Sequence, residues 1–318
     1  MTHRIVFLDR DSVPADVPRP GFPHAWQEFG QTAQEEIVER LAGASIAISN
    51  KVPLRADTLA GLPDLRMIAI AATGSDNVDL DYCRARGIIV SNVRGYAVHA
   101  VPEHVMALVL ALRRNLFAYR ADIRAGRWQR SVHFCFADHP IRDLAGGTLA
   151  IVGSGALGQG VARLARAFGM AVIQAERKGA PVVRAGHVPF DVALATADIV
   201  SLHCPLTPDT RNLIGGAELA RMKPGALLIN TARGALVDEA ALACALREGR
   251  IAAGLDVLSK EPPEAGNPLL APDLLDLPNY ILTPHVAWAS SEAVAVLARQ
   301  VIGNIEAFAA GQPRNVLT

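Results

Sequence analysis

The sequence predicts an α/β protein of two domains, each built on a doubly wound parallel sheet. Short apolar runs alternate with helical patterns along nearly all of its 318 residues, as in stacked βα units. An unpatterned stretch at residues 120–144 separates two such series. A chain of this length usually exceeds one hydrophobic core, and its 51% hydrophobic residues exclude wholesale disorder.

The first series contains four expected strands, which are short apolar runs: Ile5–Leu8, Ser45–Ser49, Leu65–Ala71 and Ile88–Ser91. Helical patterns lie between and after them, at Ala33–Ala42, Leu80–Arg86 and about Pro102–Tyr119. The longest begins at a proline, whose fixed φ suits a first helical turn. The stretch 120–144 carries Trp128, Phe134 and Phe136 without a clear period, and a loop this long usually serves a partner or a site.

The second series contains six expected strands: Gly147–Gly153, Ala171–Glu176, Asp198–Cys204, Ala226–Ala232, Ala252–Val257 and Tyr280–Thr283. The chain closes with a helical stretch at Ser290–Ala310, which is apolar on one face. Periodicity does not indicate which of the two domains this last helix covers.

Charge and composition exclude several classes of protein. Lys plus Arg and Asp plus Glu both number 31, and this zero balance argues against a surface for nucleic acid or anionic lipid. The most apolar stretch, Val105–Leu112, is far shorter than the roughly 20 residues of a membrane span, and no secretory signal is visible. The four cysteines are scattered and form no CxxC pair. We expect a cytoplasmic protein with reduced cysteines and no metal site, nucleic-acid partner or membrane partner.

The sharpest local motif is Gly153-Ser154-Gly155-Ala156-Leu157-Gly158, a GxGxxG turn between a predicted strand and a helix. Gly153 permits the tight turn, Gly155 lets the backbone approach a pyrophosphate, and Gly158 lets the helix pack close to the strand. The free N–H groups of the helix would hold the diphosphate. Glycine-rich turns are common in α/β proteins, but here strand, helix and a following acidic residue agree on a Rossmann cofactor domain.

That acidic residue is Glu176, eighteen residues beyond Gly158 at the end of the next predicted strand. A carboxylate there can accept both ribose hydroxyls of adenosine and repels a 2′-phosphate, so NAD(H) is favoured. Arg177 and Lys178 follow at once, and an arginine could accommodate that phosphate. NADP(H) therefore stays open.

Three later strand ends carry residues suited to carbonyl reduction: Arg233, Glu261 in the loop after Asp256, and His285. In a doubly wound sheet, the chemistry lies beyond the carboxyl ends of the strands. Histidine is the natural proton donor near neutral pH, a carboxylate beside it would fix its tautomer, and a guanidinium would bind a substrate carboxylate bidentately. Each residue alone could be structural. Together, after a cofactor turn, they predict a hydride-transfer enzyme.

From Gly153 to His285 the sequence resembles the D-isomer-specific 2-hydroxyacid dehydrogenases. Five runs carry the resemblance: GSGALG, SLHCPLTPDTRNLI (Ser201–Ile214), MKPGALLINTARGALVDEAAL (Met222–Leu242), GLDVLSKEPP (Gly254–Pro263) and PNYILTPHVAW (Pro278–Trp288). It extends upstream through AATGSDNVDL and VPEHVMALVLALRRN, and so covers nearly the whole chain. The runs AERKG, HVAWAS and FADHPIRDLAG are most similar to the glycerate dehydrogenase, or hydroxypyruvate reductase, branch.

The resemblance implies reversible reduction of a 2-keto acid, hydroxypyruvate or glyoxylate, to the D-2-hydroxy acid with NADH. It assigns Arg233 to substrate binding, His285 to acid/base catalysis and Glu261 to the carboxylate paired with that histidine. Backbone amides at Gly74 and Ser75 would bind the substrate carboxylate, and Lys51 is a further candidate for that charge. The expected cofactor contacts are Gly153, Gly155, Ala156, Leu157 and Gly158, then Glu176, Arg177, His203, Cys204 and Thr210 at the adenosine side, and Thr231, Ala232, Asp256 and His285 at the nicotinamide.

The resemblance also implies how the domains are arranged along the chain. Residues 1–98 and 289–318 would form a flavodoxin-like substrate domain, and residues 99–288 a Rossmann cofactor domain inserted in it. Closure of the cleft would expel water before hydride transfer. The 120–144 stretch matches a dimerisation arm, so we expect a homodimer formed through the cofactor domain and this arm.

Other functions on the same scaffold stay open at this point. Formate dehydrogenases carry glutamine where Glu261 stands, which argues against that activity. Phosphite dehydrogenases keep an Arg–Glu–His trio, and D-lactate or other 2-keto acid reductases also fit. Phosphoglycerate dehydrogenases often append a regulatory domain and would need more basic residues than the sequence offers. The alternative of another class is a non-catalytic, NAD-sensing interaction protein; such proteins tend to carry flexible tails, and none is visible here.

Overall fold

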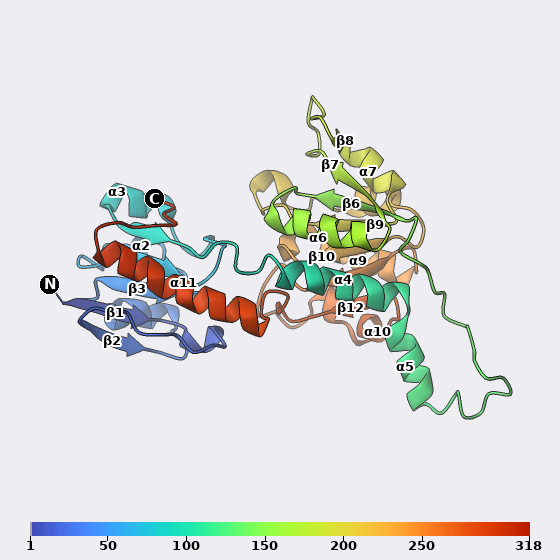
Figure 1. The fold of residues 1–318 in the computed structure, drawn as a ribbon, viewed down its shortest axis with the longest axis horizontal. Helices are drawn as coiled ribbons and strands as arrows, with labels where there is room; N and C mark the ends of the chain where they lie inside the picture. The colour runs from blue at the N-terminus through green and yellow to red at the C-terminus, as the bar shows by residue number, and fades with distance from the viewer. Residues whose placement is uncertain (1) are drawn as a thin grey trace. The chain divides into compact units, whose positions relative to one another are not determined.

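The computed structural model describes residues 2–318, which fold into two compact units (Figure 1). The discontinuous unit consists of Met1–Ala97 and Ala289–Thr318, and the inserted unit is Val98–Trp288. The boundaries predicted after residues 98 and 288 fall within one residue of these. The strands of both sheets pair in parallel, which confirms the predicted α/β class with parallel sheets.

The discontinuous unit has the sheet order β2-β1-β3-β4-β5, which is the flavodoxin-like order. Its strands are β1 (His3–Phe7), β2 (His24–Glu28), β3 (Ile46–Ser49), β4 (Met67–Ile70) and β5 (Ile89–Ser91). Its helices are α1 (Ile37–Arg40), α2 (Ala56–Ala60), α3 (Leu80–Arg86) and α11 (Ser291–Ala309). Every position of β3 and β4 is buried, as expected for parallel strands covered on both faces, and this is why their sequences are apolar runs.

Two elements of this unit differ from the sequence prediction. Strand β2 lies outside the predicted strands, because HAWQE is a largely exposed edge strand without an apolar run. The predicted helix Ala33–Ala42 is a 3₁₀ turn, Gln34–Glu36, followed by the four residues of α1. Helix α3 has the predicted bounds, because Asp79 caps its first turn and Gly87 ends it with a φ of +69°.

The closing helix α11 belongs to the discontinuous unit and packs against β4 (Figure 1). The buried Asn304 side chain of α11 donates a hydrogen bond to the carbonyl of Asn92 at 2.9 Å. Beyond α11, Val316 pairs with Ser91 at the edge of β5. Two segments from opposite ends of the sequence therefore complete one core.

The inserted unit has the sheet order β12-β11-β10-β9-β6-β7-β8. Counted within the unit from the β8 edge, this is 3-2-1-4-5-6-7, the Rossmann order extended by one strand. Its strands are β6 (Thr148–Val152), β7 (Ala171–Ala175), β8 (His187–Val188), β9 (Ile199–Leu202), β10 (Leu227–Asn230), β11 (Ala252–Leu255) and β12 (Tyr280–Leu282). Its helices are α4 (Ala100–Arg113), α5 (Leu116–Arg124), α6 (Ala156–Ala167), α7 (Phe190–Thr196), α8 (Gly216–Arg221), α9 (Glu239–Arg247) and α10 (Pro272–Leu275).

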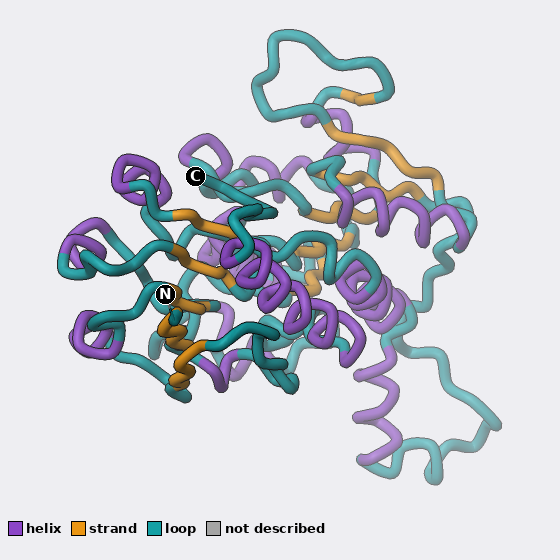
Figure 2. Tube along the Cα trace, turned by 60° about the vertical axis from the view of Figure 1, so that its left-hand side comes forward, coloured by secondary structure: helices purple, strands orange, loops and turns teal. Residues whose placement is uncertain are grey.

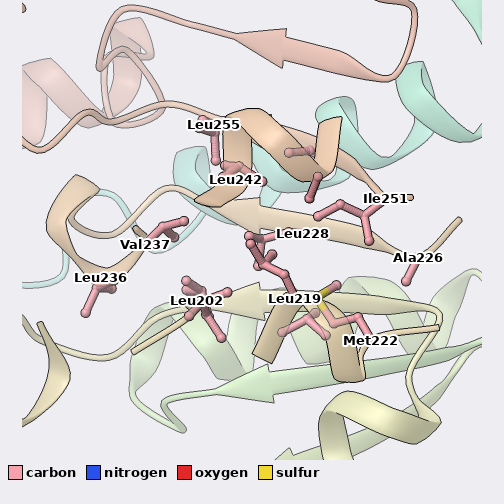
Figure 3. Close-up of a cluster of buried hydrophobic side chains, with 14 of the residues drawn as sticks. Leu202, Leu219, Met222, Ala226, Leu228, Leu236, Val237, Leu242, Ile251 and Leu255 are labelled. Atoms are coloured by element: carbon pink, nitrogen blue, oxygen red, sulfur yellow. The ribbon is translucent and has the colours of Figure 1, made fainter. Parts of the chain in front are cut away.

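The core of the inserted unit lies between its central strands and the helices on them. Figure 3 shows Leu202 of β9 and Leu228 of β10 among side chains that include Leu219 of α8 and Leu242 of α9. Helices α4 and α6 pack on each other and on strands of the same sheet. Strands β9 and β10 are buried throughout, so the sheet holds its strand ends rigidly.

Two elements of the inserted unit also differ from the prediction. The single helix expected over residues 102–119 is two helices, because Asn115 between α4 and α5 adopts a left-handed φ of +50°. Strand β8 was not predicted, since it pairs with β7 over two residues only and is too short for a pattern. Helix α5 and the loop after it extend away from the sheet of this unit (Figure 2). That loop corresponds to most of the unpatterned stretch 120–144.

Candidate active site

The glycine turn lies where β6 ends, at the point where the strand order of the inserted unit reverses. Gly153 has a φ of +104°, and a Cβ there would lie 2.6 Å from the backbone nitrogen of Cys204, just after β9. A Cβ on Gly158 would collide with the carbonyl of Gly153. No described atom lies within 4 Å of a Cβ built on Gly155, so internal packing does not require that glycine. The turn is therefore shaped from within at Gly153 and Gly158 and is open at Gly155.

Helix α6 begins directly at this turn, at Ala156. Its N-cap residue, Gly155, has no side chain that could accept hydrogen bonds from the N–H groups of the first turn. The first N–H groups of a twelve-residue helix, together with its dipole, therefore face the opening at the switch point. This is the arrangement that binds a diphosphate, and Ala156 and Leu157 supply the N–H groups of that first turn.

At the end of β7 the buried carboxylate of Glu176 accepts four hydrogen bonds. Its Oε1 accepts from the backbone N–H of Arg177 at 2.8 Å and from Nη2 of Arg184 at 2.8 Å. Its Oε2 accepts from the backbone N–H of Arg184 at 3.0 Å and from its Nε at 2.7 Å. These bonds, those from the Arg184 side chain first, lower the pKa of Glu176 to about 2. Arg184 was not predicted, because it lies eight residues further on in a loop without a motif.

The residues after β9 form the wall beside the glycine turn. Nε2 of His203 lies 2.8 Å from Oγ of Ser201, and burial lowers the pKa of this histidine to about 4. Burial also raises the pKa of the Cys204 thiol. The Thr210 hydroxyl donates to the carbonyl of Pro205 at 2.8 Å and so closes the following loop on itself. Because its pKa is about 4, His203 is neutral at physiological pH.

The turn after β10 contains Thr231, Ala232 and Arg233. The buried side chain of Asn230 shapes it, accepting from Ala232 N–H at 3.0 Å and donating to the carbonyl of Arg233 at 2.9 Å. The Thr231 hydroxyl is buried and has no hydrogen-bond partner among residues 2–318, so a bound amide or carboxamide could satisfy it. Asn230 was not predicted as a site residue, although it stands next to the predicted set.

Asp256, buried after β11, holds the turn that carries His285. Its carboxylate accepts from the backbone N–H groups of Val286 at 2.9 Å and Ala287 at 2.8 Å, and from the Thr283 hydroxyl at 2.5 Å. Its carbonyl accepts from His285 N–H at 2.8 Å. These bonds maintain a φ of +55° at His285, which a non-glycine residue seldom adopts. Asp256 therefore positions the histidine turn, in addition to its predicted place near the cofactor.

The histidine and the glutamate of the predicted trio are in direct contact. Nδ1 of His285 lies 2.5 Å from Oε2 of Glu261, whose Oε1 accepts from the backbone N–H of Leu258 at 2.9 Å. This contact assigns Nδ1 to the carboxylate and leaves Nε2 for proton exchange. Arg233 stands at the same end of the sheet, since Gly234 packs so closely on Leu258 that a side chain there would collide with its backbone.

The remaining predicted residues lie in the discontinuous unit. Lys51 follows β3, and its backbone N–H is held by the buried carboxylate of Asp9 at 2.6 Å. Gly74 and Ser75 follow β4. The Asn77 side chain donates to the carbonyl of Val52 at 3.2 Å and so joins the two loops. Lys51, Gly74 and Ser75 are thus neighbours within this unit, at the carboxyl ends of adjacent strands.

Comparison with known proteins identifies the family. Residues 106–287 match the model of the D-isomer specific 2-hydroxyacid dehydrogenase, NAD binding domain. The chain belongs to this family. A glycerate dehydrogenase of Methylorubrum extorquens is 52% identical to this dehydrogenase over 319 residues, covering 100% of this chain and 99% of that one.

Two solved structures extend the comparison. A D-lactate dehydrogenase from Aquifex aeolicus, complexed with NAD and lactic acid, has a TM-score of 0.79 at 26% identity and covers 98% of this chain and 96% of its own. An NADPH-dependent glyoxylate/hydroxypyruvate reductase from Sinorhizobium meliloti has a TM-score of 0.81 at 27% identity, with 99% and 98% covered. This dehydrogenase is thus an oxidoreductase with an NAD-binding domain, for which NAD(H) is favoured and NADP(H) stays open.

No helix within residues 2–318 is long and apolar enough to span a membrane. Over the same range, no group of three or more His, Cys, Asp and Glu side chains could hold a metal ion. All four cysteines are unpaired.

Proposed function

We propose that this dehydrogenase reduces hydroxypyruvate or glyoxylate to the corresponding 2-hydroxy acid, with NADH as the favoured donor and with D stereochemistry at C2 where that carbon is chiral. The contact between His285 and Glu261 carries the proposal, because reduction of a carbonyl needs a positioned proton donor. The choice of substrate is supported by the 52% identity to a glycerate dehydrogenase over the full chain. The reaction is reversible, so oxidation of the hydroxy acid uses the same groups.

The residues have the following roles in this proposal. Arg233 binds the substrate carboxylate through its guanidinium and polarises the neighbouring carbonyl. His285 donates a proton from Nε2 to the carbonyl oxygen, while Glu261 holds Nδ1 and stabilises the charged imidazolium. The backbone amides of Gly74 and Ser75 bind the carboxylate, and Lys51 adds positive charge.

The bound cofactor supplies the hydride that adds to C2 of the keto acid. In the proposal, the glycine turn and the first turn of α6 hold its diphosphate, and the unpartnered Thr231 hydroxyl meets the carboxamide together with Ala232. Glu176 binds the hydroxyls of the adenosine ribose, and Arg177 lies beside it in the sequence. His203, Cys204 and Thr210 line the adenosine side. Exclusion of water from these residues keeps the proton on His285 for the substrate.

We also propose a homodimer in the cytoplasm. Helix α5 and the loop after it expose a group of large apolar side chains, which is unusual on the surface of a monomeric protein. They are Leu116, Phe117, Ile123, Trp128, Val132, Phe134 and Ile141. A second copy of the chain is the occupant that would cover them. The four free thiols and the metabolic relatives support the cytoplasm as the compartment.

A steady-state panel tests the proposed function. Purified protein is supplied with hydroxypyruvate, glyoxylate, pyruvate or 3-phosphohydroxypyruvate, each with NADH and with NADPH, and the nicotinamide absorbance is followed. We expect the highest kcat/KM with hydroxypyruvate or glyoxylate and NADH. A preference for pyruvate, or NAD⁺ reduction by phosphite, would assign another enzyme on this scaffold. Absence of turnover with every keto acid would favour the interaction protein.

A further inference from the structure

Glu176 and Arg184 form a closed pair at the end of β7. Four N–H donors reach the carboxylate, and three of them come from Arg184 or its backbone. A carboxylate offers about four lone-pair positions, so every acceptor position of Glu176 is used. The hydroxyls of an adenosine ribose would have to replace some of these donors before Glu176 could bind them.

The two side chains differ in what they present to solvent. The Glu176 side chain is 4% exposed and that of Arg184 is 54% exposed, so the outer surface of the pair is the guanidinium. The neighbouring Lys178 is engaged elsewhere, because its Nζ lies 2.8 Å from Glu218. The end of β7 therefore presents a cation where the acidic residue of an NAD site is expected.

The loop that carries Arg184 is exposed and is not held by apolar packing. It connects β7 to β8, the two-residue edge strand, and its residues 181–186 are exposed, with Val182 at 73%. Movement of Arg184 away from Glu176 would uncover almost no apolar surface. The guanidinium is 54% exposed, so water can replace its bonds when it moves, whereas the buried carboxylate of Glu176 needs other donors, which the ribose hydroxyls would supply.

We propose that Arg184 determines the cofactor specificity of this dehydrogenase by competing with the NAD(H) ribose for Glu176 and by binding the 2′-phosphate of NADP(H). For NAD(H), the ribose hydroxyls displace the guanidinium from the carboxylate. For NADP(H), the guanidinium turns one or more N–H groups to the phosphate and shields it from Glu176. The pair thus admits both cofactors, and its loss makes the site more selective for NAD(H). This rests on the proposed role of Glu176 at the ribose and is independent of the keto acid.

The test is equilibrium binding of two unreactive fragments, 5′-AMP and adenosine 2′,5′-bisphosphate, to the full chain by titration calorimetry. In Arg184→Gln we expect the bisphosphate to bind about tenfold or more weakly, because a charge-assisted bidentate contact is lost. AMP should bind as tightly as in the parent or several-fold more tightly. The NADH and NADPH dissociation constants should shift in the same directions. Since neither fragment reacts, the affinity ratio is measured whether or not hydroxypyruvate is the substrate.

Arg166→Gln is the matched control, because this exposed arginine lies in the last turn of α6, at the opposite end of that helix from the glycine turn. Its ratio of bisphosphate to AMP affinity should stay within about twofold of the parent. Arg184→Lys keeps the charge but loses the fork, so its ratio should lie between those of the parent and Arg184→Gln. Equal weakening of both fragments by Arg184→Gln would overturn the proposal and show that Arg184 only supports Glu176. A change in Arg166→Gln as large as in Arg184→Gln would also overturn it.

Discussion

Nδ1 of His285 lies 2.5 Å from Oε2 of Glu261, and the backbone N–H of Leu258 holds the other carboxylate oxygen at 2.9 Å. The glutamate therefore has one oxygen for the scaffold and one for the histidine. A carboxylate held in this way keeps the imidazole in one tautomer and one orientation. The left-handed backbone at His285 adds to this constraint.

Replacement of the histidine should abolish most of the catalysis. In His285→Ala we expect kcat to fall roughly 10²-fold or more, as for the loss of a general acid, with NADH still bound. Glu261→Gln, which keeps an oxygen for Leu258 N–H but loses the charge, should fall less. Steady-state kinetics with hydroxypyruvate measure both, and the exposed His133→Ala serves as the control. Near-normal kcat in His285→Ala would contradict its role as proton donor.

The guanidinium shape of Arg233 should matter more than its charge. Arg233→Lys keeps the positive charge but cannot bind a carboxylate bidentately. We expect the KM for the keto acid to rise about tenfold or more, while the dissociation constant for NADH changes little. The comparison is made at saturating NADH, with binding of the cofactor measured separately. An unchanged KM would place the substrate carboxylate elsewhere.

The hydrogen bonds of Thr283 and Asp256 should support catalysis by positioning His285. The Thr283 hydroxyl contacts both Oδ1 of Asp256 at 2.5 Å and Nε2 of His104 at 3.0 Å. Thr283→Val removes these bonds at constant shape and should lower kcat roughly tenfold, because small displacements of a catalytic group are costly. Thr283→Ser retains the hydroxyl and should keep most of the activity. Equal kcat in the two variants would show that the hydroxyl does not position His285.

His203 should make the stability of the fold depend on pH. Its pKa is about 4 in the folded chain, whereas an unfolded histidine has its ordinary value of 6.5. As the pH falls below 6.5, the unfolded chain takes up a proton that the folded chain refuses, so stability is lost toward pH 4. Between about pH 7.5 and about pH 5 this amounts to about 2 kcal/mol. Urea unfolding at both pH values measures the free energy of unfolding of the parent and of His203→Gln. The parent should lose more of it between the two pH values than the variant does. An equal loss in both proteins would contradict the prediction.

The apolar side chains of α5 and the following loop should support self-association. Phe134 is 89% exposed, and its replacement by serine should weaken the proposed dimer, so that light scattering after size exclusion reports the mass of one chain at low concentration. Val182→Ser, at 73% exposure in the β7–β8 loop, is the control and should leave the mass unchanged. A parent protein that is monomeric at every concentration would contradict the dimer.

The elements that the sequence predicts well are those whose own residues carry the signal. Strands β9 and β10 are buried on both faces and therefore consist of apolar runs. The GxGxxG turn is recognisable because collisions at Gly153 and Gly158 require glycine whatever the rest of the chain does. Strand β2 has no such pattern, since its pairing with β1 at the sheet edge leaves its side chains largely in solvent.

The site shows the same division. Arg233, Glu261 and His285 can be proposed from the sequence because each follows a predicted strand, and strand ends of a parallel sheet converge. Arg184, Asn230 and Thr283 acquire their importance from hydrogen bonds to particular partners: Glu176, the turn after β10 and Asp256. Such partners depend on side-chain direction and loop path. No periodicity or spacing encodes them.

The insertion of one unit within the other dictates an order of events during synthesis. The ribosome releases β1 to β5 first, but α11, which packs on β4, emerges only after all 191 residues of Val98–Trp288. At roughly 5–20 residues per second that delay is about 10–40 s. The inserted unit can reach its native state in this interval, while the five strands of the first sheet are already made but the surface of β4 that α11 covers is still exposed. The first part of the protein to be synthesised is thus the last to be completed, because the surface of β4 stays uncovered until α11 has been made.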